Sequence, residues 1–509
     1  MHPSELALTQ PDKPAVILGG SGKVITYADL DRISNQGAHL FRSLGLKAGD
    51  HIAMQLENGE HFVPLLWAAR RSGLIYTAMS THLKRDEVTY IVRNCEAKVV
   101  IISASLGEVG QAAREIVSEV AHWYMVDEVA PGFESWESAL ARQPGTPIAD
   151  EQSGIPMLYS SGTTGQPKGI MPPWQPGQPV GPVPQDIAGL ARLFGFDGNT
   201  VYLSPAPLYH AAPLMYVTMV TLLGGTCVIM EKFDAERCLA LVEQHKITHA
   251  QFVPIMFVRM LQLSDATRLR YDVSSFKYAI HAAAPCPQDI KQRMIDWWGP
   301  VVYEYYSSTE GGGFVSLNSQ EWLQHRGSVG RAIVGVLHIV GEDGQELPAG
   351  EIGTVYFSDI RTRFEYYKEP GKTSKAYNEQ GWMTVGDVGY LDADGYLYLS
   401  DRKDFMIISG GVNVYPQEIE NLLQIHDAVA DVAVFGVPDA EFGETVKAVV
   451  QPRDWLRAGP ELEKQLIAYC RERLSHVKCP RSIDFDAHLP RLDNGKLYKK
   501  QIRARYLKS

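Results

Sequence analysis

The sequence predicts a mixed α/β protein in which a large N-terminal domain of parallel sheets, with a small β-barrel attached, precedes a smaller α+β domain. Three observations support this prediction: the chain length, an alternation of strand-like and helix-like segments, and a change of pattern near residue 331. The 509 residues are too many for one hydrophobic core, so we expect two or more domains. Hydrophobic residues make up 45% of the chain and charged residues 21%, which is typical of a folded globular protein and not of a disordered one.

Strand-like and helix-like segments alternate through the first part of the chain. Residues 97–103 (AKVVIIS) form a short β-rich segment, and residues 224–230 (GGTCVIM), 234–246 (DAERCLALVEQHK) and 247–253 (ITHAQFV) follow the order strand, helix, strand. This order predicts βαβ units and a mostly parallel sheet. The most apolar stretch, residues 214–230, is interrupted by Gly224 and Gly225, so we expect a buried helix, a turn and a buried strand in place of a membrane span.

The pattern changes between residues 331 and 399. Short β-like runs such as GTVYFS and GYLYLS are separated by turn sequences such as EDGQ and DADG, which predicts a small antiparallel sheet or barrel. Beyond it, YPQEIENLLQIHDAV is helical, VADVAVFGVP is strand-like and ELEKQLIAYCRERL is an amphipathic helix. The charged segment SDRKDFM lies between the two parts and suits a hinge, so we place the domains at residues 1–403 and 404–509.

Residues 172–184, PPWQPGQPVGPVP, depart from this regularity. Proline has no backbone N–H to donate and is excluded from helix interiors, so the segment is predicted to be a loop.

Charge and cysteine content exclude some classes of protein. The net charge of −11 disfavours a nucleic-acid-binding protein, which needs basic surface to meet phosphates. The six cysteines are scattered and form no CxxC pair, so we expect free thiols in a reducing, cytoplasmic compartment. The N-terminal residues MHPSELALTQPDKPAV lack a basic segment followed by an apolar one, so no signal peptide is predicted.

The segment YSSGTTGQPKG, residues 159–169, combines hydroxyl side chains, glycines and one lysine. Glycines let backbone N–H groups approach a ligand closely, hydroxyls donate to phosphate oxygens, and Lys168 adds positive charge. The segment is not a Walker A motif, because Gly169 follows the lysine where serine or threonine is required. The composition suits a phosphate-binding loop and a flexible surface turn about equally, because loops rich in glycine, serine and threonine are common.

Three further segments have features of a nucleotide site. YEYYSSTEGGG, residues 303–313, offers aromatic rings for a nucleobase and a glutamate for Mg²⁺. Asp387 lies in a glycine-flanked turn and can accept hydrogen bonds from ribose hydroxyls, and Lys496 follows Asn494 and Gly495 in a tight basic turn. Taken singly, each segment has a structural explanation: a strand end, a turn aspartate and a solvated basic tail.

In this order and spacing, the segments together resemble the adenylate-forming superfamily, which contains acyl-CoA synthetases, nonribosomal adenylation domains and luciferases. YSSGTTGQPKG is similar to the phosphate loop of that family, and HAAAPCP and YYSSTEG to its adenine-site segments. TVGDVGYLDADGYLYLSDRKDFMIISGGVNVYPQEIE resembles its ribose, hinge and CoA motifs, and PRLDNGK its C-terminal lysine loop. The resemblance covers nearly the whole chain and implies that the smaller C-terminal domain is mobile.

The resemblance implies an ATP-dependent acyl-CoA ligase. In the first half-reaction a carboxylate attacks the α-phosphorus of ATP, which expels pyrophosphate and leaves an acyl-AMP. In the second, the CoA thiol attacks the acyl carbon and AMP leaves. ATP, Mg²⁺, CoA and a small-molecule carboxylic acid are therefore the expected partners, and a homodimer is compatible with the sequence.

The resemblance also assigns roles to individual residues. Those for the reacting phosphates are Ser161, Thr163, Thr164 and Lys168 in the phosphate loop, Thr309 at the α-phosphate, Glu310 at Mg²⁺, and Lys496 at the carboxylate and α-phosphate. Those for the nucleoside are Ala283 and Ala284 beside the base, Glu304 near the adenine amino group, Tyr306 stacked on adenine, and Asp387 and Arg402 at the ribose. Gly410 and Gly411 line the CoA tunnel, and Asp404 is the hinge about which the small domain rotates between steps. Ser307 departs from the family, which commonly has glycine after the adenine tyrosine.

The resemblance places the acyl pocket at uncharged positions, namely His210, Ala212, Tyr216, Gly312 and Phe314, with Gly313 and Met256 nearby. The small residues suggest depth and the aromatic residues suggest apolar walls, so we expect a hydrophobic monocarboxylic acid: a medium or long fatty acid, or a bulky aryl or polycyclic acid. Two alternatives stay open. One is an adenylating enzyme that passes the acyl group to a carrier protein, and the other is a catalytically idle nucleotide-binding protein of the same fold.

Overall fold

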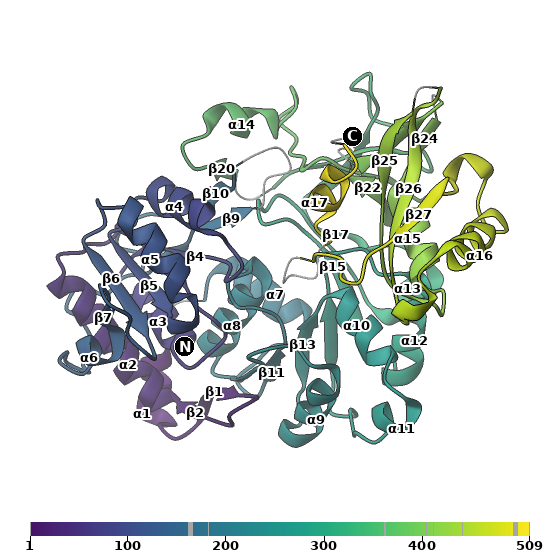
Figure 1. The fold of residues 1–509 in the computed structure, drawn as a ribbon. Helices are drawn as coiled ribbons and strands as arrows, with labels where there is room; N and C mark the ends of the chain where they lie inside the picture. The colour runs from purple at the N-terminus through teal and green to yellow at the C-terminus, as the bar shows by residue number, and fades with distance from the viewer. Residues whose placement is uncertain are drawn as a thin grey trace. The chain divides into compact units, whose positions relative to one another are not determined.

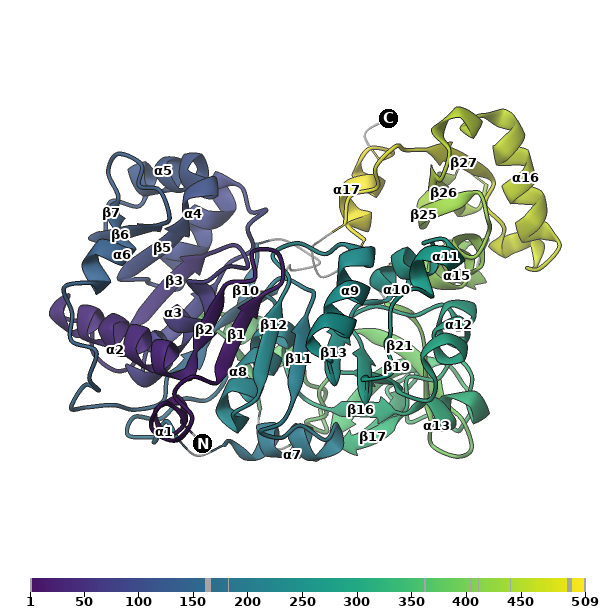
Figure 2. The ribbon, with the colours of Figure 1, turned by 90° about the horizontal axis from the view of Figure 1, so that it is seen from below.

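The computed structural model describes residues 2–160, 166–181, 183–360, 363–402, 405–410, 412–439, 441–491 and 497–507, and Figures 1 and 2 show its fold from two sides. The chain forms two units. Unit 1 contains Met1–Gln251, Asp265–Ala279 and Thr362–Ser374, and unit 2 contains Phe252–Ser264, Ile280–Arg361 and Lys375–Ser509. Strand β14 (Tyr278–His281) gives its first two residues to unit 1 and its last two to unit 2. This division does not follow the predicted boundary at residues 403 and 404, which stays a prediction.

The first sheet of unit 1 has six strands in the order β7-β6-β5-β3-β4-β8, and all its pairings are parallel. Figure 2 shows helices α2 and α3 on one face and α4 and α5 on the other. All residues of β5 are buried, as expected for a strand covered on both faces. The strands are β3 (His51–Gln55), β4 (Ile75–Ala78), β5 (Val99–Ser103), β6 (His122–Val126), β7 (Glu134–Ser135) and β8 (Ile155–Pro156). The helices are α1 (Pro3–Thr9), α2 (Tyr27–Ser43), α3 (Phe62–Arg71), α4 (Arg85–Asn94), α5 (Gly107–Ile116) and α6 (Trp136–Leu140).

A second group of strands in unit 1 has the order β13-β11-β12-β1-β2. Its elements are β1 (Pro14–Leu18), β2 (Val24–Thr26), β11 (Val201–Ser204), β12 (Thr226–Ile229) and β13 (His249–Phe252), with α7 (Gln185–Leu193), α8 (Ala211–Leu223), α9 (Ala235–His245) and α11 (Asp265–Arg268). The predicted buried helix, turn and strand are confirmed as α8, a left-handed Gly224 (φ 86°) and β12. The predicted strand–helix–strand unit is confirmed as β12–α9–β13, but β11 lies between its two strands and pairs in parallel with both.

A three-stranded antiparallel sheet completes unit 1, with β10 (Lys168–Met171) between β9 (Leu158–Ser160) and β20 (Glu365–Tyr366), and α14 (Pro370–Lys375) follows it. The proline-rich segment after β10 contains no helix or strand in its described residues, as predicted. Trp174 anchors this loop: its Nε1 donates to the carbonyl of Ser153 at 3.0 Å, and its ring lies 3.0 Å from where a Cβ of Gly49 would stand. A side chain at position 49 would therefore crowd the indole ring.

Unit 2 begins with α10 (Pro254–Leu261) and α12 (Gln288–Trp298), followed by an antiparallel group in the order β17-β16-β15. These strands are β15 (Val302–Tyr306), β16 (Phe314–Leu317) and β17 (Arg331–Val334), and α13 (Ser319–Gln324) connects the last two. The region predicted as a small sheet or barrel is a four-stranded antiparallel sheet in the order β18-β19-β21-β22. It consists of β18 (Val336–Val340), β19 (Gly353–Ser358), β21 (Asp387–Leu391) and β22 (Leu397–Arg402).

The C-terminal part of unit 2 has a sheet and a hydrophobic core of its own. The sheet has the order β24-β23-β26-β25, with β27 added in parallel to β26. Its elements are β23 (Ile407–Ser409), β24 (Val412–Val414), β25 (Val429–Asp439), β26 (Gly443–Pro452), β27 (Ser482–Phe485), α15 (Pro416–Gln424), α16 (Pro460–Arg471) and α17 (Lys499–Ala504). The core that α15 and α16 form with this sheet runs from Ile407 to Ile483. A core contained within these residues is what a separate C-terminal domain requires.

All six cysteines are free, which confirms that part of the prediction, and the compartment stays a prediction. Among the helices in the described ranges, none combines the length and the apolar character needed to cross a membrane.

Candidate functional site

The β9–β10 hairpin carries the segment predicted to bind phosphates. Ser160 on β9 is paired with Lys168 on β10, so the loop starts and ends at partner positions of an antiparallel ladder. Ser161, Thr163 and Thr164 lie outside the described residues. The structure therefore gives the frame of the loop and the position of Lys168, and the roles of the three hydroxyl residues stay predictions.

Aromatic side chains fix this frame. The hydroxyl of Tyr159 donates to Oδ1 of Asn94, the last residue of α4, at 2.5 Å. A Cβ on Gly169 would stand 3.1 Å from the Tyr159 ring, so glycine lets that ring lie across the hairpin. The Lys168 ammonium lies 4.7 Å from the ring centroid of Tyr366 on β20, a cation–π contact. Sequence reasoning missed Tyr366, because only the pairing of β20 with β10 brings it beside the lysine.

The loop between β15 and β16 carries Thr309 and Glu310. The hydroxyl of Ser307 donates to the carbonyl of Gly313 at 2.9 Å, and that of Ser308 donates to the carbonyl of Gly311 at 3.0 Å. These bonds close the loop on itself, with Thr309 exposed and Glu310 half-buried at its turn. Ser307, which departs from the family pattern, therefore ties the two ends of the loop together.

Three residues predicted to contact the nucleoside come together in unit 2. The hydroxyl of Tyr306, at the end of β15, donates to Oδ2 of Asp387 at 2.6 Å. Asp387 is the first residue of β21, is 7% exposed, and faces Arg402 across the β21–β22 ladder. These residues lie far apart in the sequence, so their meeting is a property of the fold.

The predicted adenine segment follows β14, where Ala283 is exposed in a left-handed conformation (φ 75°) and Ala284 is half-buried. These two residues leave backbone at the surface with only methyl side chains beside it. That arrangement suits contact with a flat ligand.

Glu304 is buried and engaged in an ion pair. Its Oε2 lies 2.5 Å from Nζ of Lys291 on α12 and 3.6 Å from Nε2 of His281, and all three side chains are buried. Burial raises the pKa of Glu304, which Lys291 opposes, and burial together with the Lys291 charge holds the pKa of His281 well below its ordinary value. The carboxyl of Glu304 is therefore committed to Lys291, a residue that sequence reasoning missed, and its role at the adenine amino group stays a prediction.

The predicted acyl-pocket residues of unit 1 lie on or beside α8. His210 is the residue before the first turn of α8, and its ring centroid is 4.5 Å from that of Tyr209, while Ala212 is half-buried in that turn. Tyr216 is fully buried, with its ring centroid 5.7 Å from Tyr202 and 5.6 Å from Phe196. Tyr216 is thus a core residue of unit 1 in this structure.

The structure gives a different reason for the small residues of unit 2. A Cβ on Gly312 would stand 2.1 Å from Sδ of Met383, and one on Gly313 would stand 1.9 Å from Cδ1 of Phe357. The space beside both glycines is therefore filled by side chains of unit 2, and it does not provide the depth inferred from the sequence. Phe314 stacks on Tyr305 with centroids 5.0 Å apart. In the same unit, Met256 is buried within α10.

The predicted CoA, hinge and lysine positions belong to the C-terminal part of unit 2. Gly410 lies at the turn after β23 with φ 57°, and its N–H donates to the carbonyl of Phe442 at 2.8 Å. Gly411, Asp404 and Lys496 lie outside the described residues, and so does the side chain of Arg402.

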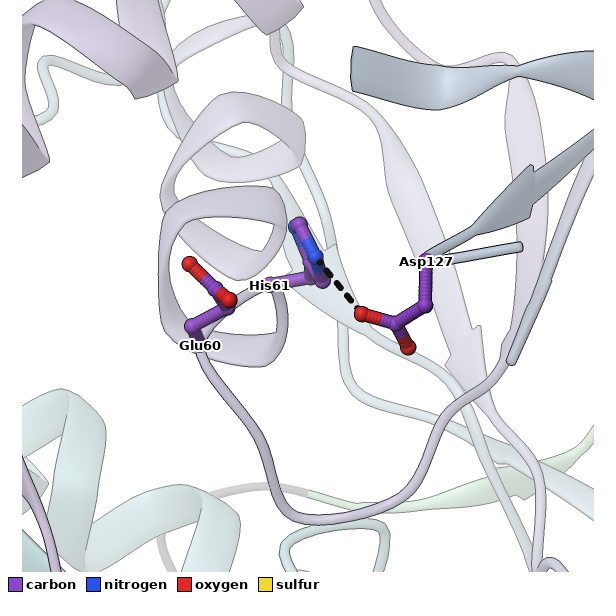
Figure 3. Close-up of side chains that lie close together, drawn as sticks. All are labelled: Glu60, His61 and Asp127. Carbon is purple, nitrogen blue, oxygen red and sulfur yellow. Dashed lines mark ion pairs between the residues drawn. The ribbon is translucent and has the colours of Figure 1, made fainter. Parts of the chain in front are cut away.

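Another group of charged residues has the composition of a metal site. Glu60, His61 and Asp127 lie together at the start of α3, with one ligand atom of each within 4.8 Å of the others (Figure 3). Each already has a charged partner: Glu60 pairs with Lys23, and Nε2 of His61 lies 3.3 Å from Asp127 and 3.2 Å from Glu137. These ion pairs account for the group, and we assign no metal to it.

Comparison with known protein families identifies the family of this chain. The profile of AMP-binding enzymes matches residues 4–367, and that of the AMP-binding enzyme C-terminal domain matches residues 418–496. The chain belongs to the AMP-binding enzyme family. It is therefore an enzyme of the adenylate-forming superfamily, of the AMP-forming acid–thiol ligase type, as the sequence resemblance implied.

Relatives of this AMP-binding enzyme match it over nearly the whole chain. A long-chain-fatty-acid–CoA ligase, FadD13 of Mycobacterium tuberculosis, is 31% identical over 504 residues, which are 98% of this chain and 97% of the relative. A feruloyl-CoA synthase of Amycolatopsis is 30% identical over 507 residues, which are 99% of this chain and 98% of the relative. Among solved structures, ATP-bound MatB from Rhodopseudomonas palustris is 27% identical with a TM-score of 0.81, and covers 100% of this chain and 99% of its own.

Proposed function

We propose that this enzyme is an ATP-dependent ligase that converts a hydrophobic monocarboxylic acid to its CoA thioester through an acyl-AMP. The hydrogen bond between Tyr306 and Asp387, with Arg402 opposite on the β21–β22 ladder, is the observation that carries the proposal. It supports a nucleoside site in which the Tyr306 ring stacks on adenine while Asp387 and Arg402 bind the ribose. The exposed Ala283 and the half-buried Ala284 then flank the base.

In the first half-reaction an oxygen of the substrate carboxylate bonds to the α-phosphorus, and the bond from that phosphorus to pyrophosphate breaks. An anion thus approaches a polyanion, so cations and hydrogen-bond donors must surround the phosphates. We assign the phosphate loop, including Thr163, Thr164 and Lys168, to the leaving phosphates. We assign Thr309 and Lys496 to the α-phosphate, where Lys496 also offsets the charge of the attacking carboxylate.

Magnesium would be held at Glu310. Glu310 is half-buried and follows Ser308 and Thr309 in the sequence, so this loop offers one carboxylate and two hydroxyls, all of them oxygen ligands. Such a set fits Mg²⁺, which prefers one or two carboxylates and completes its shell with phosphate oxygens and water. When bound, the ion neutralises negative charge on the phosphates.

In the second half-reaction the CoA sulfur bonds to the acyl carbon and the bond to AMP breaks. We assign Gly410 and Gly411 to the CoA passage, residues 404–509 to a mobile domain and Asp404 to its hinge. Rotation about this hinge would present Lys496 for adenylation and the two glycines for thioester formation. The separate core between Ile407 and Ile483 supports treating this part as a domain.

The proposed acid is a medium or long fatty acid, or a bulky aryl or polycyclic acid. The positions assigned to the acyl pocket carry no charged side chain, so a second charge on the acid would lose hydration without a partner. The relatives that act on long-chain fatty acids and on ferulate support the same class. Each methylene buried adds about 0.8 kcal/mol, which favours such acids over acetate.

The test is pyrophosphate–ATP exchange with acetate, a dicarboxylate, a medium-chain fatty acid, a cinnamate-like acid and a polycyclic acid, followed by CoA addition. We expect exchange without CoA, thioester and AMP once CoA is present, and the highest kcat/KM for a hydrophobic monocarboxylate. Exchange without any thioester would favour transfer to a carrier protein, and no exchange with any acid would indicate an idle protein. A highest kcat/KM for acetate or the dicarboxylate would overturn the acid class alone.

A further inference from the structure

Lys496 lies outside the described residues, but the residues on both sides of the segment that carries it are held in place. Arg491 and Leu497 are partners in an antiparallel bridge, and the N–H of Tyr498 donates to the carbonyl of Pro490 at 2.9 Å. Residues 492–496 connect these two sides, and Lys496 immediately precedes Leu497. Because the residues on both sides are held in place, they limit where Lys496 can lie.

The first side is held by a two-pronged ion pair. Nε and Nη2 of Arg491 donate to Oδ2 and Oδ1 of Asp431 at 2.5 and 2.6 Å. Asp431 is a buried residue of β25, and its Oδ1 also accepts from the N–H of Val432 at 2.8 Å. Two parallel hydrogen bonds fix the orientation of a guanidinium as well as its distance.

The second side is held by a buried ion pair. Nζ of Lys499 lies 2.8 Å from Oε2 of Glu420 on α15, and both side chains are 9% exposed. The other carboxyl oxygen, Oε1, accepts from the N–H of Val434 at 2.7 Å. Val434 and Asp431 are three residues apart on β25, so the ion pairs on both sides of the turn attach to the same strand.

Other contacts already attach the C-terminal segment to this sheet. Leu489 and Ile502 are buried against Phe435 and Val449, with Leu497 packed beside them. Nε of Arg503 donates to the carbonyl of Gly436 at 3.0 Å, and its Nη2 donates to Glu444 at 2.7 Å. Buried ion pairs are often no more stabilising than apolar residues of the same size, so stability alone is a weak explanation for two of them here.

We infer that the ion pairs Arg491–Asp431 and Lys499–Glu420 are positioning devices that set the place of Lys496 for adenylation. The inference rests on the role proposed above for Lys496. Lys496 is three residues from Lys499 and five from Arg491, so loosening either pair displaces the turn directly. A displacement of about 1 Å in a reacting group can lower a rate on the order of a hundredfold.

The test uses Glu420→Gln and Asp431→Asn, which keep size and remove charge, in the full-length enzyme. The readouts are pyrophosphate exchange, thioester formation from supplied acyl-AMP, and the thermal midpoint. We expect the kcat of exchange to fall about tenfold to a hundredfold, KM for ATP to change less than twofold, and the second half-reaction to stay within twofold. Lys499→Arg, which keeps the charge, should retain most of the exchange rate.

Two further variants keep the inference falsifiable if a neutral variant fails to fold. Arg491→Lys keeps the charge but loses the two-pronged contact, so it should slow exchange with little effect on the thermal midpoint. Arg503→Gln is the matched control: it removes an ion pair from the same segment without touching the turn, and should leave exchange within twofold.

Equal losses in both half-reactions, or an Arg503→Gln loss as large as that of Glu420→Gln, would overturn the inference in favour of a purely structural role. Normal exchange in folded Glu420→Gln and Arg491→Lys would also overturn it. If Lys496→Ala keeps normal exchange, the proposed role of Lys496 fails instead, and the two failures are thereby distinguishable.

Discussion

Replacing Tyr306 with phenylalanine removes one hydroxyl and leaves the ring. The lost hydroxyl donates to Oδ2 of Asp387 at 2.6 Å, and Asp387 is 7% exposed, so little water is available to replace the donor. A hydrogen bond to a carboxylate is worth about 1.5–3 kcal/mol, which corresponds to roughly a tenfold to 150-fold change in an equilibrium constant. Since the ring remains to stack on adenine in the proposed site, the loss falls on the positioning of Asp387 at the proposed ribose position.

We therefore expect Tyr306→Phe to raise KM for ATP, by at most roughly tenfold to 150-fold, and to change kcat little. A nucleoside contact made equally in the ground state and the transition state affects KM and not kcat. Pyrophosphate exchange measured over a range of ATP concentrations, with the acid saturating, gives both constants.

Tyr398→Phe is the matched control, because Tyr398 donates to Oδ2 of Asp392 at 3.2 Å in the same sheet, just beyond the other end of β21. An unchanged KM for ATP in folded Tyr306→Phe would refute the reasoning. An equal rise in Tyr398→Phe would also refute it, since the effect would then belong to the sheet and not to a ribose contact.

Three other predictions follow from the geometry and the proposed roles. Gly313→Ala should lower the free energy of unfolding by about 3 kcal/mol or more, seen as a lower thermal midpoint, because its Cβ would stand 1.9 Å from Phe357. A Cβ on Gly311 meets nothing within 4 Å, so Gly311→Ala should lower the free energy of unfolding by only about 1–2 kcal/mol, for its φ of 77°. Burial raises the pKa of Glu420 to about 7, so the folded enzyme keeps a proton that the unfolded chain releases above its ordinary pKa of 4.5. The contribution of Glu420 to stability is then lost as pH rises through 7, and the midpoint of the wild type should fall relative to that of Glu420→Gln between pH 5 and 8; a constant difference would contradict this. Gly411→Leu should block thioester formation and spare acyl-AMP formation, and equal losses in both assays would remove it from the CoA passage.

Local sequence patterns predicted individual helices and strands well, but they could not predict which distant segments pair with one another. The helix α8, the turn at Gly224 and the strand β12 follow from one apolar run and two glycines. The same sequence gives no sign that β11 lies between β12 and β13, because hydrogen-bond partners in a parallel sheet are chosen by the whole domain.

The candidate site divides in the same way. Tyr306, Asp387 and Arg402 could be found because each stands in a recognisable segment, and the fold brings them together. The ion pair of Glu304 with Lys291 could not be found from the sequence, because it depends on how α12 packs against β15. Gly312 and Gly313 misled for a general reason: a glycine indicates that space is needed beside the backbone, and it does not say which neighbour occupies that space.

The register of the β9–β10 hairpin has a consequence for enzyme engineering. Successive residues of a strand point to opposite faces, so the direction of the Lys168 side chain is set by its pairing with Ser160 and not by the length of the loop between them. Inserting or deleting residues within positions 161–167 while keeping this ladder would change the reach of the loop and leave the cation where it is. A slip of one residue inside β10 would instead place Gly169 opposite Ser160 and turn the ammonium to the other side of the sheet. If the loop binds phosphates as proposed above, libraries of loop length are therefore a way to vary the accepted phosphate donor without rebuilding the rest of the site.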